Sequence, residues 1–81
     1  SKIIAVGLNY IDHCKEANLP VPAEPVLFSK FPNSITGPFD ELSWPEGVTK
    51  EVDYEVELAV VIGRRGRNIP EKDALDYVCG Y

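Results

Sequence analysis

Two glutamates, Glu55 and Glu57, are separated by one residue in the segment EVDYEVELAVVIG (residues 51–63). Residues two apart in a strand share a face and lie about 6.6 Å apart along the backbone. Flexible carboxylates at this spacing can converge on one hard divalent cation, Mg²⁺ or alternatively Mn²⁺ or Ca²⁺, rather than on zinc. The spacing alone favours a solvated acidic edge instead, because two carboxylates are fewer ligands than such an ion usually takes.

A second pair, His13 and Glu16, is three positions apart in a segment predicted to be helical. Residues i and i+3 lie on one helix face, so the carboxylate can hold one ring nitrogen and leave the other to take a proton. That arrangement orients a general base. The spacing alone favours an ordinary exposed pair. The catalytic interpretation rests on His13 being the single histidine, in a helix that follows a buried strand through Gly7.

Lys30 interrupts the apolar segment VLFSKF (residues 26–31). A lysine among such neighbours either contacts an anion or snorkels from an edge strand, and both interpretations stay open. Three arginines crowd the turn that follows the third predicted strand, and we interpret them as solvated: Arg64, Arg65 and Arg67.

Short elements must position these side chains. Apolar runs rich in β-branched residues predict strands, and residues 51–63 form the longest of them. One face of that strand is apolar or aromatic, whereas the other begins with three acids and ends with small or apolar residues, so we expect the acids at the lip of an enclosed space. The predicted elements are strands at 2–8, 26–31 and 51–63, a helix at 10–17 capped by Asn9, a proline-rich connector at 19–25, a turn at 64–68, a helix at 70–77 and a new element from residue 78.

Composition narrows the classes of function. The net charge of −5 argues against binding to nucleic acid or to an anionic membrane surface. No apolar run approaches the roughly 20 residues needed to span a bilayer. Cys14 and Cys79 show no metal-binding spacing, so we expect two reduced thiols. A length of 81 residues makes one small domain at most. Because the sequence contains no methionine, we expect a chain processed or cut from something longer.

Several strings, taken in order, resemble the fumarylacetoacetate hydrolase family, and in particular its branch of domain-containing proteins. The resemblance covers nearly the whole chain, with residues 39–52 as its weak part. It implies a mainly β (α+β) fold, a mixed β-roll or barrel with short helices at its mouth, of which residues 1–81 are the N-terminal portion. The strings are GLNYxDHxxE (7–16), EPVLFxK (24–30), DYEVELAVVIG (53–63), RNIxxxxA (67–74) and DYVxGY (76–81).

The resemblance also implies roles for individual residues. Glu55 and Glu57 would bind Mg²⁺, Mn²⁺ or Ca²⁺ with an aspartate beyond Tyr81. His13, paired with Glu16, would transfer protons from a segment that can close over the ligand. Lys30 would contact the substrate.

The implied activity is metal-dependent chemistry on small β-keto or diketo acids, such as acylpyruvates or oxaloacetate. C–C bond hydrolysis, decarboxylation and keto–enol tautomerisation are all in the family's range, and these residues do not choose among them. The resemblance further implies a homodimer, and both cytoplasm and mitochondrial matrix fit. The alternative is a non-catalytic fragment that serves as an interaction or cation-binding piece. In either case we expect the isolated 81 residues to be inactive and poorly stable.

Overall fold

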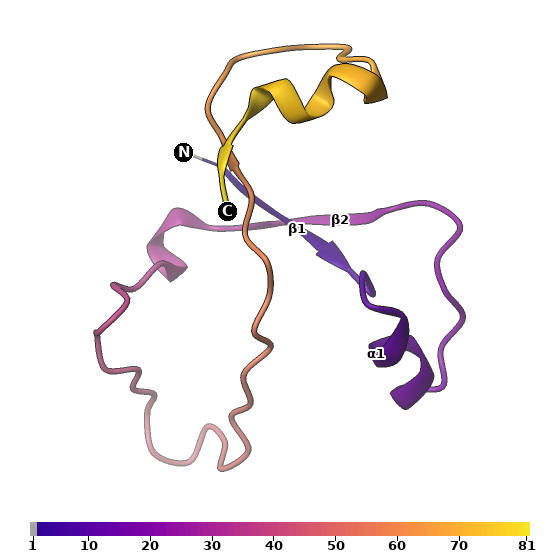
Figure 1. The fold of residues 1–81 in the computed structure, drawn as a ribbon. Coiled ribbons are helices and arrows are strands. Elements are labelled where there is room, and N and C mark those ends of the chain that lie inside the picture. The colour runs from indigo at the N-terminus through magenta and orange to yellow at the C-terminus, as the bar shows by residue number, and fades with distance from the viewer. Residues whose placement is uncertain (1) are drawn as a thin grey trace. The chain divides into compact units, whose positions relative to one another are not determined.

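The computed structural model describes residues 2–81, which divide into two units. The first unit ends at Trp44 and the second runs from Pro45 to Tyr81. Figure 1 shows short elements joined by long irregular stretches, above all between η1 and β3. In chain order the elements are β1 (Ile3–Gly7), α1 (Ile11–Glu16), β2 (Val26–Lys30), the 3₁₀ turn η1 (Pro32–Ser34), β3 (Val61–Ile62), the 3₁₀ helix η2 (Glu71–Tyr77) and β4 (Val78–Gly80).

In the first unit, β1 and β2 form an antiparallel pair in which Ile3 lies opposite Lys30 and Gly7 opposite Val26. Isoleucine and valine dominate β1, and such residues fit a pleated surface well. The strands predicted at 2–8 and 26–31 are confirmed; the first is one residue shorter at each end and the second is one residue shorter at its C-terminal end. The proline-rich connector between α1 and β2 contains neither helix nor strand, also as predicted.

Helix α1 confirms the prediction for residues 10–17, but its cap differs from the predicted one. Tyr10 is the N-cap and makes no side-chain cap bond, so the assignment of Asn9 is wrong. The chain turns at Leu8, where φ is +52°, and the helix starts after that turn. At the other end Asn18 takes φ +54°, and its N–H donates to the Lys15 carbonyl at 3.1 Å. Asparagine tolerates this left-handed conformation, which ends helices in Schellman motifs.

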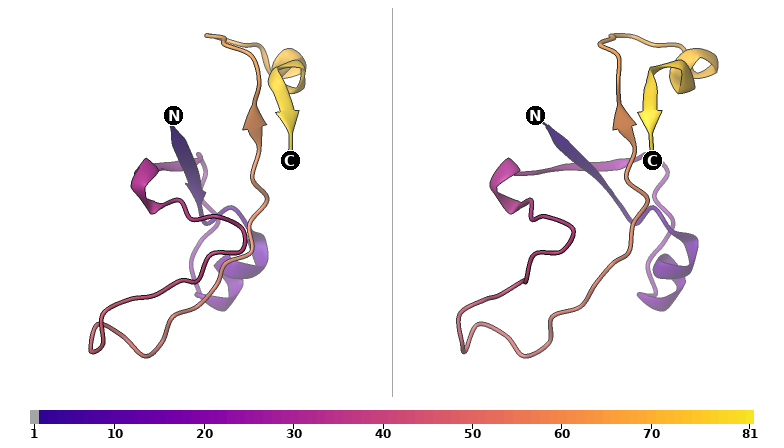
Figure 2. Two further views of the ribbon diagram at one scale, coloured as in Figure 1. Left: turned by 90° about the vertical axis from the view of Figure 1, so that its left-hand side faces the viewer. Right: turned by 60° about the vertical axis from the view of Figure 1, so that its left-hand side comes forward.

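In the second unit, β3 and β4 pair antiparallel with Val61 opposite Gly80, and the pair is visible as neighbouring arrows in both views of Figure 2. The element predicted from residue 78 is thus confirmed as β4. Helix η2 occupies the predicted range but is a 3₁₀ helix, and Pro70 precedes it with extended ψ of 144°. Its φ of −60° still suits the entry into a helix.

The long strand predicted at residues 51–63 is wrong for residues 51–60. Within residues 51–63, Val61 and Ile62 are the residues that the structure assigns to a strand, and they pair with β4. Val56 takes φ +50°, which interrupts the alternation of side chains between two faces. An alternating pattern becomes a strand only where a neighbouring strand pairs with it, and residues 51–60 are paired with no strand of the described residues. Short strands and few helices agree with a mainly β class, and closure into a barrel stays a prediction.

Within residues 2–81 a single side chain is buried, that of Cys14, which is 1% exposed. Large apolar side chains lie open instead, including Tyr54 at 83% and Val56 at 81% exposure. Neither unit therefore has an extended core in this structure. Cys14 and Cys79 are both free cysteines in this structure, and their reduced state stays a prediction.

No helix within residues 2–81 combines the length and the apolar composition that a membrane crossing requires.

Candidate functional site

His13 and Glu16 lie one turn apart on α1, and both side chains are exposed. No hydrogen bond or ion pair joins them in the part of the chain that the structure describes. The ion pair of this helix joins Lys15 Nζ to Asp12 Oδ1 at 3.9 Å, between side chains that are 73% and 94% exposed. Such exposed pairs add little stability, about 0–1 kcal/mol. The structure thus brings His13 and Glu16 to one helix but not into contact.

Between them in sequence lies Cys14, for which the sequence predicts a reduced thiol but no role in a site. Its thiol donates to the carbonyl oxygen of Leu8 across 3.5 Å. A weak signal for its burial is present in IDHCKE, because Cys14 and Ile11 are the apolar residues of this helix and are three positions apart, although Ile11 itself is 61% exposed. His13 and Glu16 lie on the exposed side of the helix, away from the buried Cys14.

Lys30 ends β2, two residues after Phe28 and therefore on the same side of the strand. Its Nζ lies 6.0 Å from the centre of the Phe28 ring, at the outer limit of a cation–π contact. The side chain is exposed. The contact with Phe28 fits the interpretation of Lys30 as a lysine that snorkels from an edge strand. The exposed ammonium could also bind an anion, and that role stays a prediction.

Glu55 and Glu57 flank the left-handed Val56 in the irregular segment of the second unit. Both are exposed, and their carboxylates accept no hydrogen bond within residues 2–81. Nearby Asp53 differs, because its Oδ1 accepts the backbone N–H of Tyr54 at 2.9 Å. The described residues contain no group of three or more His, Cys, Asp or Glu that could hold a metal ion. Two free carboxylates suit a hard cation chemically and would supply part of its ligands.

The predicted site residues belong to different units. His13, Glu16 and Lys30 belong to the first unit, and the two glutamates belong to the second.

The arginines after β3 are exposed, as predicted, but one of them has a partner. The guanidinium carbon of Arg64 lies 5.4 Å from the centre of the Tyr77 ring. This contact joins the turn after β3 to the end of η2. It is structural, because it ties together two segments of the same unit.

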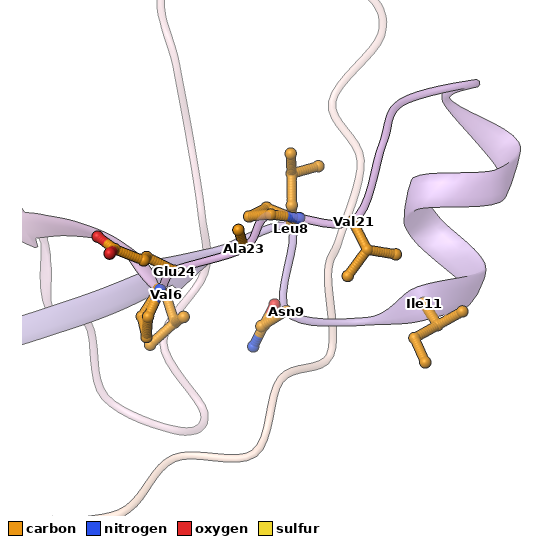
Figure 3. A pocket seen from close by; sticks show the side chains of 9 residues that line it. Val6, Leu8, Asn9, Ile11, Val21, Ala23 and Glu24 are labelled. Atoms are coloured by element: carbon orange, nitrogen blue, oxygen red, sulfur yellow. The ribbon is translucent and has the colours of Figure 1, made fainter.

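A pocket of about 260 Å³ lies in the first unit, beside the turn from β1 into α1. In Figure 3, Val6 and Glu24 lie at one end and Ile11 at the other, with Asn9 between them. The lining is mostly apolar, and none of the predicted site residues contributes to it. It is formed by Val6, Leu8, Asn9, Ile11 and the connector residues 21–25.

The short antiparallel pairs agree with a mainly β class of protein, and the ordered motifs indicate the family. Residues 2–81 match the family model described as fumarylacetoacetate (FAA) hydrolase C-terminal. The chain therefore belongs to the fumarylacetoacetate hydrolase family, which confirms the resemblance found in the sequence.

Among curated relatives, the chain is 58% identical over 80 residues to the mitochondrial oxaloacetate tautomerase fahd2 of Xenopus laevis, covering 99% of this chain and 25% of the relative. It is 56% identical over the same shares to the human mitochondrial oxaloacetate tautomerase FAHD2B. A Dictyostelium discoideum homolog of fumarylacetoacetate hydrolase domain-containing protein 2 is 55% identical, over 99% of this chain and 26% of the relative. The chain thus spans about a quarter of the length of these relatives. No solved structure matches it significantly.

Proposed function

We propose that the whole protein to which this chain belongs is an enzyme that interconverts the keto and enol forms of oxaloacetate or a closely similar acid. The observation that carries the proposal is the identity of 56–58% to proteins named oxaloacetate tautomerases, over 99% of this chain. Those relatives are also named as mitochondrial, which supports a mitochondrial location here. The family's other reactions, C–C bond hydrolysis and decarboxylation, are the alternatives for the same acid.

The proposal includes a divalent cation, Mg²⁺ or otherwise Mn²⁺ or Ca²⁺, held in part by Glu55 and Glu57. Its support is the chemistry of two exposed carboxylates that accept no hydrogen bond in residues 2–81. When bound, the ion would supply positive charge that stabilises an enolate oxygen.

The proton transfer falls to His13. Tautomerisation moves one proton from the carbon next to the keto group onto the oxygen, with no net gain or loss. The imidazole takes the proton from carbon and returns it to the enolate oxygen. Glu16, one turn along α1, can reach the ring by a rotamer change and hold its other nitrogen. The exposed ammonium of Lys30, loosely held over Phe28, offers positive charge to a substrate carboxylate.

The test uses the purified whole protein with oxaloacetate and Mg²⁺, and follows the ultraviolet absorbance of the enol. His13→Ala should slow tautomerisation by about 100-fold or more, as expected for loss of a general base, and leave Mg²⁺ affinity unchanged. Lys15→Ala on the same helix is the matched control and should keep full activity. An active His13→Ala variant would reject the assignment. Product analysis of the same reaction separates the alternatives: pyruvate and CO₂ would instead support decarboxylation, and oxalate and acetate would support C–C bond hydrolysis.

A second candidate function, a cation-binding or interaction piece without chemistry, has its own support in the exposed acids of residues 51–57. It requires that the whole protein bind Mg²⁺ and turn over none of these acids. The same assay therefore separates it from the enzyme.

A further inference from the structure

The most enclosed side chain of the described residues lies directly beside the proposed general base. Cys14 is 1% exposed, and no other side chain in residues 2–81 is buried. Its neighbour His13 is exposed on the same six-residue helix. A helix this short does not hold itself in water, so contacts at its ends must keep it folded.

Cys14 makes those contacts on both sides of the helix. Before the helix, its thiol donates to the Leu8 carbonyl at 3.5 Å, and its N–H donates to the Tyr10 carbonyl at 3.2 Å. After the helix, its carbonyl accepts the N–H of Leu19 at 2.8 Å. The last bond is the longer-range bond of the Schellman motif that ends α1. One residue therefore links the segment that enters the helix to the segment that leaves it.

The two linked segments each contain a left-handed turn. Leu8 has φ +52° before the helix and Asn18 has φ +54° after it. Leucine at positive φ is costly, so the entering turn needs compensating contacts. The thiol of Cys14 bonds to the carbonyl of that same leucine.

Burial of Cys14 also fixes the rotation of the helix about its axis. Successive helical residues are rotated by about 100°. With Cys14 turned inward, His13 lies about 100° and Glu16 about 160° around the helix from it, so both face outward and are about 60° apart. Loss of the inward anchor would free the helix to rotate or unfold, and His13 would lose its fixed direction.

We infer that Cys14 is a positioning residue for His13: it clamps α1 between its two turns and so aims the imidazole. This inference rests on the proposed function. Cys14 does not act on the substrate, because its thiol is buried and bonded to the Leu8 carbonyl.

The kinetic test uses the whole protein and three variants. Cys14→Ala removes the thiol donor and should lower kcat for oxaloacetate tautomerisation by about tenfold, with Mg²⁺ affinity and KM nearly unchanged, because the loss falls on a proton-transfer step. Cys14→Ser keeps a donor for the Leu8 carbonyl and should retain most of the activity. Cys79→Ser is the matched control, since that thiol is exposed. Equal activity of Cys14→Ala and Cys79→Ser would overturn the inference.

A double variant separates positioning from a general loss of structure. If Cys14 acts through His13, adding Cys14→Ala to His13→Ala should cause no further loss, because the imidazole is already gone. Multiplying losses would overturn the inference.

A structural readout on the whole protein, labelled for nuclear magnetic resonance, keeps the inference apart from the proposed function. In wild type and Cys14→Ser, the ¹³Cα shifts of residues 11–16 should be helical, and in Cys14→Ala they should move toward coil values. Unchanged helical shifts in Cys14→Ala would overturn the clamp. If His13→Ala proves fully active, the proposed function fails, whereas the clamp is still decided by these shifts.

Discussion

The backbone N–H of Gly63 donates a hydrogen bond to the carbonyl oxygen of Tyr77 at 2.9 Å. This bond extends the β3–β4 pair beyond its two paired positions, and the guanidinium of Arg64 lies over the Tyr77 ring beside it. The approach leaves no room for a side chain at position 63. A Cβ atom there would come within 2.7 Å of the Cys79 Cβ and 3.4 Å of its Cα.

Gly63→Ala should therefore break the β3–β4 pair. Overpacking of this kind costs about 1–3 kcal/mol, which lowers the population of the paired state severalfold or more. Gly80→Ala is the matched control, because a Cβ at position 80 meets nothing within 4 Å. In nuclear Overhauser spectra of the whole protein, cross-strand contacts between Ile62 and Val78 should vanish in Gly63→Ala and persist in Gly80→Ala. Their persistence in both variants would contradict the close approach.

Val56→Gly tests the left-handed backbone between the two glutamates. A β-branched residue at φ +50° is strained by about 1–2 kcal/mol, which glycine avoids. Because glycine also costs about 0.5–1 kcal/mol of chain entropy, the variant should be neutral or up to about 1.5 kcal/mol more stable. Urea unfolding of the whole protein measures this difference. Val60→Gly, at an ordinary φ, should be destabilised; equal destabilisation of both variants would mean that Val56 is extended, as the alternating pattern predicts.

Glu55→Gln and Glu57→Gln should each weaken Mg²⁺ binding to the whole protein by about tenfold or more, because each removes a charged oxygen ligand. Titration calorimetry gives the affinities. Glu51→Gln removes the same charge from the same exposed segment and should change little. If all three variants lose affinity equally, the effect is one of net charge and the two glutamates are not ligands.

The isolated 81-residue chain should unfold without a cooperative transition and should not turn over oxaloacetate. Its one buried side chain, within residues 2–81, cannot offset the conformational entropy lost on folding. Two-stranded antiparallel pairs are marginal alone. Far-UV circular dichroism on heating, with the whole protein as control, tests the first point, and the enol assay tests the second. A sharp melting transition would show that a core forms without further chain.

Local signals in the sequence were enough for the elements whose partners lie close along the chain. The Ile- and Val-rich run of β1 and the apolar run of β2 were predicted within one or two residues of their ends. The range of α1 and the element after residue 77 were predicted as well. The family followed from the order of the motifs and was confirmed by the match over residues 2–81. The roles of the five predicted site residues stay predictions.

Three features depended on backbone turns and hydrogen bonds that the pattern of residue types did not reveal. Residues 51–60 alternate like a strand, yet a strand exists only where another segment supplies hydrogen bonds, and here Val56 turns left-handed instead. The start of α1 was set by the turn at Leu8 rather than by Asn9. Cys14 became the anchor because both ends of the helix fold back onto it. Residue types and their order thus determine which chemistry the chain can offer, whereas pairing and burial decide which backbone carries it.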